Sequence, residues 1–120
     1  MSDRLTNWMN GYLKAWDSNE PDDIRALFTD DAAYEYSPSD PEPLHGIDAI
    51  VDGWIASRDE PGTWSFSWEP IVETDDLAVV QGKTKYSTKS DYDNLWVIRF
   101  APDGRAHRFT EWYMDLAGQQ

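Results

Sequence analysis

Hydrophobic residues recur at helical spacing along the first half of the chain. A helix over residues 3–17 is predicted by apolar positions that share one face, namely Leu5, Trp8, Met9, Tyr12, Leu13 and Trp16. A short second helix is predicted to begin at Pro21, because proline suits a first turn and Asp22 and Asp23 face the positive end of the helix dipole. Gly46 opens a third predicted helix, whose apolar face is formed by Ile47, Ile50, Val51, Trp54 and Ile55.

From Thr63 onward the pattern changes to a period of two, which is typical of strands with one buried face. Four such runs cover residues 64–74, 77–88, 92–100 and 106–116, and turn-forming groups separate them. A brief strand over residues 32–36 and a proline-containing loop over residues 38–43 precede the third helix. Helices followed by a meander of long strands predict an α+β fold, in a single domain spanning residues 1–120.

Composition narrows the classes of partner and compartment. The chain has 120 residues, with 10 Lys and Arg against 23 Asp and Glu, so the formal net charge is −13. This charge repels phosphate groups, and it argues against nucleic acid or an anionic membrane as a partner. The acidic excess is explained either by a high-salt cytoplasm or by an ordinary solvated surface. No stretch resembles a signal peptide or a membrane span, so a cytoplasmic protein is expected.

Other compositional features bear on the core and on cysteine chemistry. Hydrophobic residues make up 40% of the chain and aromatic residues 14%, which is enough to form a packed core. The absence of cysteine excludes disulfides, thiolate metal sites and a cysteine nucleophile.

Four segments, in this order, resemble the SnoaL-like branch of the nuclear transport factor 2-like superfamily. They are residues 12–16, 27–32, 46–50 and 100–105, with the sequences YLKAW, LFTDDA, GIDAI and FAPDGR. The resemblance implies a cone-shaped fold, with three N-terminal helices packed on a strongly curved antiparallel sheet around a pocket. It also implies a homodimer built on the outer sheet face. It implies no single chemistry, because the fold hosts isomerases, dehydratases, cyclases, epoxide hydrolases and non-catalytic binders.

Strand alternation predicts which side chains face the inside of the cone. The expected concave face consists of Val80, Thr84, Tyr86, Trp96, Ile98, Phe109, Glu111 and Tyr113. Glu111 is the one acid in this set, and poor solvation among aromatic rings raises a carboxyl pKa, as a general acid or base requires. The alternative is a structural acid that accepts hydrogen bonds from Tyr12 or Tyr86 and ties the helices to the sheet.

Comparison with superfamily members refines these roles. Residues 12–37 resemble bacterial ketosteroid isomerases, in which Tyr12 matches the oxyanion-stabilising tyrosine. Tyr36 and Trp96 replace that family's catalytic base and second oxyanion donor, so standard ketosteroid isomerisation is not expected. Glu111 also matches an aspartate of limonene epoxide hydrolases, but Gly82 and Thr84 replace its two partners. SnoaL-type polyketide cyclases use one acid from this sheet region, and Glu111 is the best match to it.

The other candidate residues have weaker support. His107 lies about 13 Å along the strand from Glu111, so the two side chains cannot form a hydrogen bond. His45 either closes the loop before the third helix or lies at the pocket rim. The chain contains no metal-ligand spacing and no glycine-rich phosphate loop, and the concave sheet face offers no arginine. Neither a metal nor a cofactor is therefore expected.

Several aromatic and apolar residues have two interpretations. Trp16 and Trp54 on the helices line the cone if the resemblance holds, although packing is the default role of such a stripe. Trp64, Phe66 and Trp68 share one strand face, which lines either the pocket or an interface. The outer sheet face carries Leu95, Val97 and Trp112 beside Arg99 and Arg108, which favours a homodimer through that face.

Two functions remain open from the sequence. The first is a cofactor-free cyclase, isomerase or dehydratase, with Glu111 as the proton carrier and Tyr12, Tyr36 or Tyr86 orienting the substrate. The second is a non-catalytic ligand-binding or dimeric accessory module. In both cases the expected ligand is a small, mostly apolar or weakly polar molecule that is uncharged or cationic.

Overall fold

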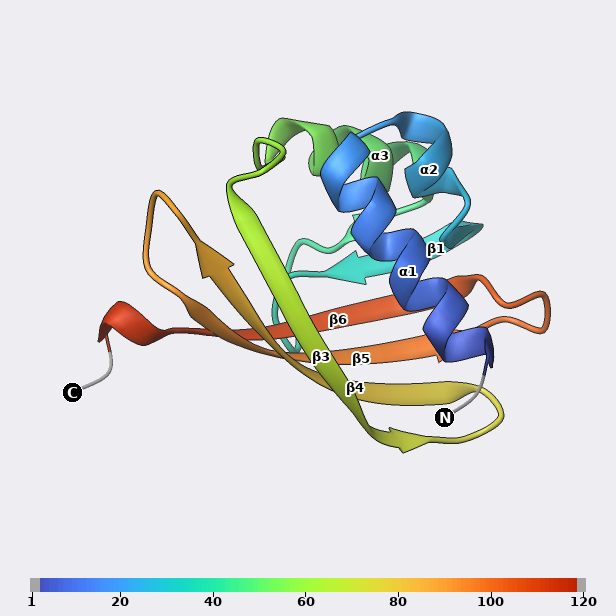
Figure 1. The fold of residues 1–120 in the computed structure, drawn as a ribbon. Helices are drawn as coiled ribbons and strands as arrows, with labels where there is room; N and C mark the ends of the chain where they lie inside the picture. The colour runs from blue at the N-terminus through green and yellow to red at the C-terminus, as the bar shows by residue number, and fades with distance from the viewer. Residues whose placement is uncertain (1–2, 119–120) are drawn as a thin grey trace.

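The computed structural model describes residues 3–118, which form three helices and six strands with a short final turn. The helices cover one face of a strongly twisted sheet (Figure 1). In chain order the elements are α1 (Asp3–Ser18), α2 (Pro21–Arg25), β1 (Phe28–Glu35), β2 (Leu44–His45), α3 (Ile47–Ala56), β3 (Trp64–Glu73), β4 (Leu77–Tyr86), β5 (Tyr92–Phe100), β6 (Ala106–Asp115) and a 3-10 turn (Leu116–Gly118). This arrangement confirms the α+β cone predicted from the sequence.

The predicted elements differ from the observed ones mainly around β1. This strand begins at Phe28, four residues before the predicted start, and the short strand β2 lies next to the expected proline loop. Ala33 and Tyr34 of β1 pair with His45 and Leu44 of β2, which explains why this part of the chain is extended. His45 thus belongs to an edge strand directly before Gly46, whose φ of 87° suits glycine at the start of α3.

The strands form one sheet in the order β2-β1-β6-β5-β4-β3. Every neighbouring pair is antiparallel except β1 with β6, which run parallel. Glu35 at the end of β1 accepts hydrogen bonds from Arg108 Nε (2.9 Å) and Thr110 Oγ1 (2.6 Å) of β6. The Arg108 guanidinium beside this carboxyl lowers the pKa of Glu35, so the ion pair fastens the parallel junction.

The hydrophobic core lies between α1 and the inner face of the sheet. Strand alternation holds on β4 and β5, where Val80, Thr84, Trp96 and Ile98 are all buried. The ring of Tyr12 lies at the centre of an aromatic cluster whose other members are Trp8, Trp16, Trp54, Trp96 and Phe109. The helical stripe predicted from the sequence is therefore the face of α1 that packs on the sheet.

A β-bulge at the start of β6 changes the predicted alternation. Arg99 pairs with Arg108, but the next residue of β5, Phe100, pairs with Ala106, so His107 has no partner across the ladder. Ala106 is consequently 0% exposed, although strict alternation placed it on the outer face. His107 is exposed at this end of the sheet, and the bulge interrupts the strict alternation that placed it on the Glu111 face, about 13 Å along the strand.

Trp64, Phe66 and Trp68, expected to line either the pocket or an interface, pack towards α1 and the core. Trp64 stacks on Trp16 of α1, with ring centroids 3.9 Å apart, and Phe66 stacks on Trp96 at 4.7 Å. Phe66 and Trp68 are partly buried against the core. These side chains therefore close the β3 edge of the core beneath α1, rather than forming part of the outer sheet face.

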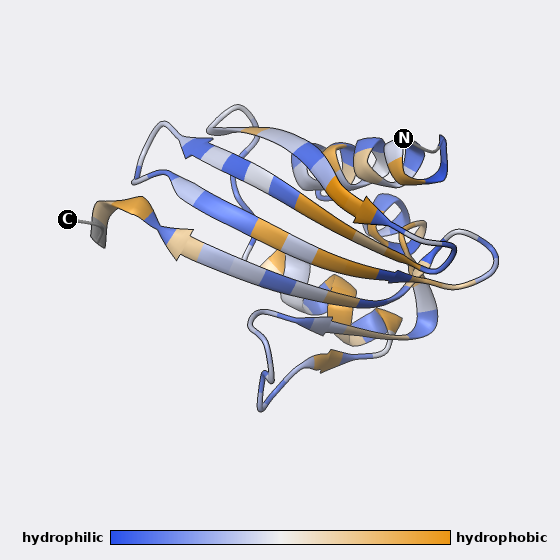
Figure 2. Ribbon diagram, turned by 90° about the horizontal axis from the view of Figure 1, so that it is seen from below, coloured by the Kyte–Doolittle hydropathy of each residue, from blue (hydrophilic) through white to orange (hydrophobic). Residues whose placement is uncertain are grey.

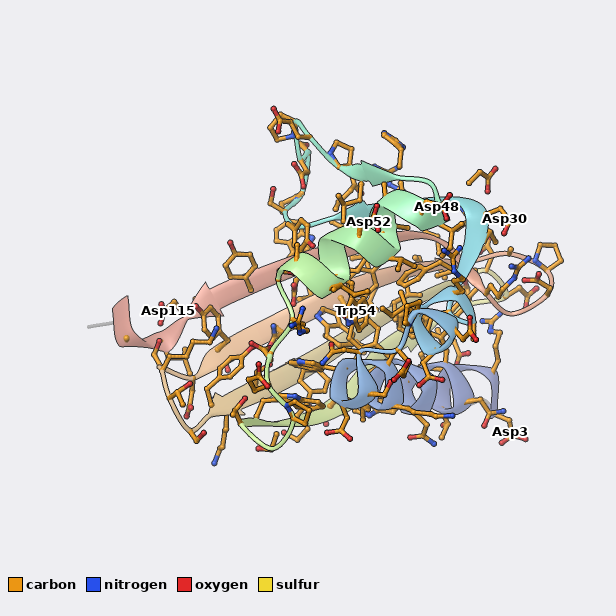
Figure 3. All side chains as sticks on the ribbon, turned by 90° about the horizontal axis from the view of Figure 1, so that it is seen from above. Asp3, Asp30, Asp48, Asp52, Trp54 and Asp115 are labelled. Atoms are coloured by element: carbon orange, nitrogen blue, oxygen red, sulfur yellow. The ribbon has the colours of Figure 1, made fainter. Side chains whose placement is uncertain are left out.

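Exposed apolar side chains lie on the outer face of the sheet, whereas exposed acids lie around the outside of the molecule. Figure 2 shows the sheet from the side opposite the helices, and Trp112 and Met114 on β6 are 47% and 52% exposed. Asp3, Asp30, Asp48 and Asp115 lie around the outside of the molecule (Figure 3), and all four are exposed.

Within residues 3–118, no helix has the length and apolar character needed to span a membrane.

Replacing Gly82 by alanine is expected to destabilise the fold. A Cβ at this position would lie 2.3 Å from Cζ of Phe66, so the ring would have to leave its stacked position on Trp96. Overpacking of this kind costs about 1–3 kcal/mol of the free energy of unfolding. Urea denaturation of Gly82→Ala, with the exposed neighbour Gln81→Ala as the control, measures it. Equal stability of the two variants would contradict this account of the β3 edge.

Candidate functional site

A cavity of about 390 Å³ opens between α1, α3 and the inner face of the sheet. Its walls are dominated by aromatic side chains from both layers: Tyr12, Trp16, Tyr34, Tyr36, Trp54, Tyr86, Tyr92, Trp96 and Tyr113. Polar groups lie among these rings: the tyrosine hydroxyls, Ser57, Thr84 and Asn94, and the charged side chains of Arg58, Asp59, Lys89 and Glu111. Such a volume accommodates a small organic molecule, and the aromatic walls favour an apolar one.

Glu111 enters the cavity from β6 and is held by two side chains of the adjacent strand β5. Its Oε2 atom accepts hydrogen bonds from Trp96 Nε1 at 2.9 Å and from Asn94 Nδ2 at 3.0 Å. Trp96 is the direct cross-strand neighbour of Glu111, and Asn94 follows on the same face. Within residues 3–118, no hydrogen-bond donor reaches Oε1, so this second oxygen is free to interact with a ligand.

Thr84 lies on β4, the strand next to β5, and helps to hold Asn94 in place. Its Oγ1 donates a hydrogen bond of 2.8 Å to Asn94 Oδ1, and both side chains are buried. The Asn94 oxygen is thereby occupied, which directs the Asn94 amide NH₂ towards Glu111. The hydroxyl, the amide and the carboxyl form a chain of hydrogen bonds across three strands, in which Thr84 fixes the orientation of Asn94 and also lines the cavity.

Burial raises the pKa of Glu111 above its ordinary value. The hydrogen bonds from Trp96 and Asn94 stabilise the carboxylate and oppose that effect, but desolvation is the larger contribution. The carboxyl is thus closer to its protonated form at neutral pH than an exposed glutamate is. A carboxyl in this condition can both accept and donate a proton.

Several tyrosines line the same cavity as Glu111, but no tyrosine hydroxyl within residues 3–118 forms a hydrogen bond with its carboxyl. The hydroxyls of Tyr12 and Tyr34 lie 2.9 Å apart and form a buried hydrogen bond with each other. Burial, followed by the nearby Glu111 charge in the case of Tyr12, raises the pKa of both groups well above the ordinary value, so both remain protonated. The hydrogen bonds from Tyr12 or Tyr86 that the structural alternative required are not formed, because Tyr12 bonds to Tyr34 and Tyr86 to Asp59, while Trp96 and Asn94 donate to Glu111.

A second acid, Asp59, lies in the loop after α3 and was not singled out by the sequence pattern. Its Oδ2 atom accepts hydrogen bonds from Trp16 Nε1 at 3.0 Å and from the Tyr86 hydroxyl at 3.1 Å. Burial and the Asp59 carboxylate raise the pKa of Tyr86. Asp59 thus ties α1 and β4 together at the entrance of the cavity. An irregular loop has no period, so sequence alternation could not reveal it.

Most of the predicted site residues line the same cavity. They are Tyr12, Trp16, Tyr36, Trp54, Thr84, Tyr86, Trp96, Glu111 and Tyr113. Ile98 and Phe109 were predicted to contact ligand, but they are 0% exposed and lie outside the cavity wall. They pair with each other across β5 and β6, and the Trp8 ring on α1 stacks against Phe109.

The structure adds residues that sequence reasoning missed. Tyr34, Asn94 and Tyr92 line the cavity from β1 and β5, and Lys89 does so from the β4–β5 turn. Arg58 lines it from the loop after α3, so the pocket does contain an arginine although the sheet face contributes none. A search of residues 3–118 finds no group of three or more His, Cys, Asp or Glu side chains that could hold a metal ion.

Comparison with known proteins identifies the family. A model of the SnoaL-like domain matches residues 9–116. The chain belongs to the SnoaL-like domain family. This SnoaL-like protein has no match among curated protein sequences.

Solved structures agree with this assignment at the level of the fold. A protein of unknown function from Burkholderia xenovorans LB400, described as NTF-2 like, is 17% identical with a TM-score of 0.74, covering 94% of this chain and 84% of that one. A steroid delta-isomerase from Pseudomonas aeruginosa is 14% identical with a TM-score of 0.66, covering 98% and 85%. A Jannaschia sp. CCS1 protein whose name places it among SnoaL-like polyketide cyclases is 14% identical with a TM-score of 0.70, covering 94% and 89%.

The stability of the wild-type protein relative to Glu111→Gln is expected to fall as the pH rises. Because burial raises the folded-state pKa of Glu111 above the unfolded value of about 4.3, the folded state binds more protons between those two pKa values. The free energy of unfolding therefore decreases with pH in that window, and glutamine does not titrate. Urea denaturation of both proteins from about pH 4.5 to about pH 8 measures the difference.

The exposed Glu69→Gln variant controls for the removal of one negative charge from the surface. A stability difference between wild type and Glu111→Gln that stays constant with pH would contradict a raised Glu111 pKa. A difference that moves in the opposite direction would show that the two hydrogen bonds outweigh burial.

Proposed function

We propose that this SnoaL-like protein binds a small, mostly apolar carbonyl compound in its aromatic cone and transfers a proton with Glu111, without a cofactor. The single observation that carries the proposal is the hydrogen bonding of the two oxygens of the Glu111 carboxyl. One oxygen is fixed by Trp96 and Asn94, while the other has no bonded donor within residues 3–118, in a cavity of about 390 Å³. A positioned carboxyl with a raised pKa is suited to general acid–base catalysis.

The proposed step is the removal of a proton from the carbon beside the carbonyl group. Glu111 Oε1 takes this proton, the carbon–hydrogen electron pair forms the enolate double bond, and the carbonyl oxygen acquires the negative charge. Tyr12 and Tyr36 line the cavity, and burial raises the pKa of both, so both hydroxyls are protonated donors for that oxygen. Return of the proton at another carbon completes an isomerisation.

The same enolate serves more than one reaction class. Its carbon attacks a second carbonyl of the ligand to close a ring, and protonated Glu111 returns the proton to the new alkoxide. Alternatively, the enolate expels a neighbouring hydroxyl group, which takes the proton from Glu111 and leaves as water. The names of the Pseudomonas isomerase and the Jannaschia protein support this range of chemistry. Ketosteroid isomerisation by the standard mechanism is not proposed, because Tyr36 and Trp96 replace the aspartates that it requires.

We also propose that the protein forms a homodimer through the outer face of its sheet. Trp112 and Met114 are about half exposed on this face, and Leu95 and Val97 beside them are only partly covered. A contiguous apolar face is stabilised when a second copy covers it, and a two-fold axis lets one patch pair with itself.

Glu111→Gln is expected to abolish catalysis while retaining binding. Wild-type protein incubated with 2-tetralone in D₂O should accelerate deuterium uptake at the carbons beside the carbonyl group, followed by proton NMR. Loss of the general base should reduce that acceleration by about 10²–10⁴-fold. Glutamine keeps an oxygen that can accept from Trp96 and Asn94, so 2-tetralone should still shift the pocket resonances. Glu69→Gln, at an exposed position of β3, is the matched control.

Two outcomes would overturn the catalytic proposal. The first is an acceleration that Glu111→Gln leaves intact. The second is binding of 2-tetralone without any accelerated exchange, which would favour a non-catalytic binding module with Glu111 as a structural acid.

Sedimentation analysis tests the dimer. The wild-type protein is expected to sediment as a dimer at micromolar concentration, whereas Trp112→Lys should shift it to the monomer, because a charge would be buried in the interface. Ile71→Lys changes an equally exposed apolar residue on the edge strand β3 and should leave the dimer intact. A wild-type monomer would refute the proposed interface.

A further inference from the structure

Two positively charged side chains lie at the entrance of the cavity of this otherwise acidic protein. Arg58 follows α3, and Lys89 lies in the turn between β4 and β5, and both line the cavity while being exposed. The two segments lie at the same end of the sheet (Figure 1), where Ser87 N donates to Thr63 O at 2.9 Å. Cations from separate parts of the chain therefore converge on one opening.

Arg58 forms no ion pair within residues 3–118, although acids outnumber bases in the chain by 23 to 10. Other cations of the structure, such as Arg25 and Arg105, are paired with neighbouring carboxylates. Arg58 instead donates from Nη1 to the Ile55 carbonyl at 3.0 Å, at the end of α3. This bond anchors the guanidinium at the rim and leaves its remaining N–H groups available.

Lys89 lies in the turn between β4 and β5 and makes two contacts, one with an aromatic ring and one with a carboxylate. Its Nζ lies 4.3 Å from the centre of the Tyr86 ring and 3.9 Å from Asp59 Oδ1. Asp59 is the acid of the rim, and its other oxygen already accepts from Trp16 and Tyr86. The four charged residues that line the cavity, Arg58 and Lys89 against Asp59 and Glu111, sum to zero, in contrast to the net charge of −13 of the whole chain, and both cations lie at the entrance.

From this geometry we infer that the ligand is a carboxylate, with an acid group bound by Arg58 and Lys89 at the rim and an apolar body inside the aromatic cavity. The inference rests on the proposed function for the identity of the pocket and its reacting end at Glu111. It replaces the expectation of an uncharged or cationic ligand. A guanidinium fork matches a carboxylate with two parallel hydrogen bonds, and such charge-assisted bonds are stronger than neutral ones.

The test compares two probes of the same shape, 2-naphthoate and the neutral 2-naphthamide, by isothermal titration calorimetry. 2-Naphthoate is expected to bind at least about tenfold more tightly at low salt, because of the charge-assisted bonds. That preference should shrink in about 0.5 M NaCl, since salt screens exposed charges. Arg58→Gln should weaken 2-naphthoate binding by about tenfold and leave 2-naphthamide binding nearly unchanged.

Lys85→Gln is the matched control, because it removes the same charge from an exposed position of β4 that does not line the cavity. Equal affinity for the two probes would overturn the inference, as would equal losses in Arg58→Gln and Lys85→Gln. Failure of both probes to bind at millimolar concentration would overturn it too. The proposed function is judged separately, because deuterium uptake by uncharged 2-tetralone does not depend on a carboxylate site.

Discussion

The pair of hydrogen bonds from Trp96 and Asn94 to one oxygen of Glu111 is the interaction on which the site depends. A carboxyl surrounded by aromatic rings loses hydration, and that loss costs several kcal/mol unless hydrogen bonds replace the water. Strand β5 supplies both donors from adjacent inward positions, and Thr84 orients the amide of Asn94. Both bonds go to one oxygen, and no donor within residues 3–118 reaches the other, so two neutral donors hold Glu111 in place.

Residues that bond to Glu111 or lie near it also pack in the aromatic core. The Trp96 ring is stacked on Phe66, packs against Tyr12 and is 1% exposed, so the core fixes the direction of its N–H. Tyr12 in turn is fixed by the rings around it and by the Tyr34 hydroxyl. A rigid aromatic core therefore fixes the polar groups of the pocket in place.

Periodicity predicted the helices, the long strands and the inward position of Glu111, because regular elements impose their period on the sequence. It was wrong at Ala106, since a β-bulge adds one residue without any signal in the pattern. It also missed Asp59, whose role depends on Trp16 and Tyr86, far away in the sequence. The hydrogen-bond partners of Tyr12 required knowledge of how β1 faces α1, which depends on tertiary packing.

The acidic surplus of the chain and the charge of the pocket act over different distances. Exposed acids such as Asp3, Asp30 and Asp115 set the net charge (Figure 3), but salt screens their influence beyond about 8 Å at physiological ionic strength. At the cavity entrance, a charged side chain that touches a bound molecule would have a larger electrostatic effect on it than these distant exposed acids. Arg58 forms no ion pair within residues 3–118, so under the proposed carboxylate binding its charge would act on the ligand at closer range than the net charge of the protein.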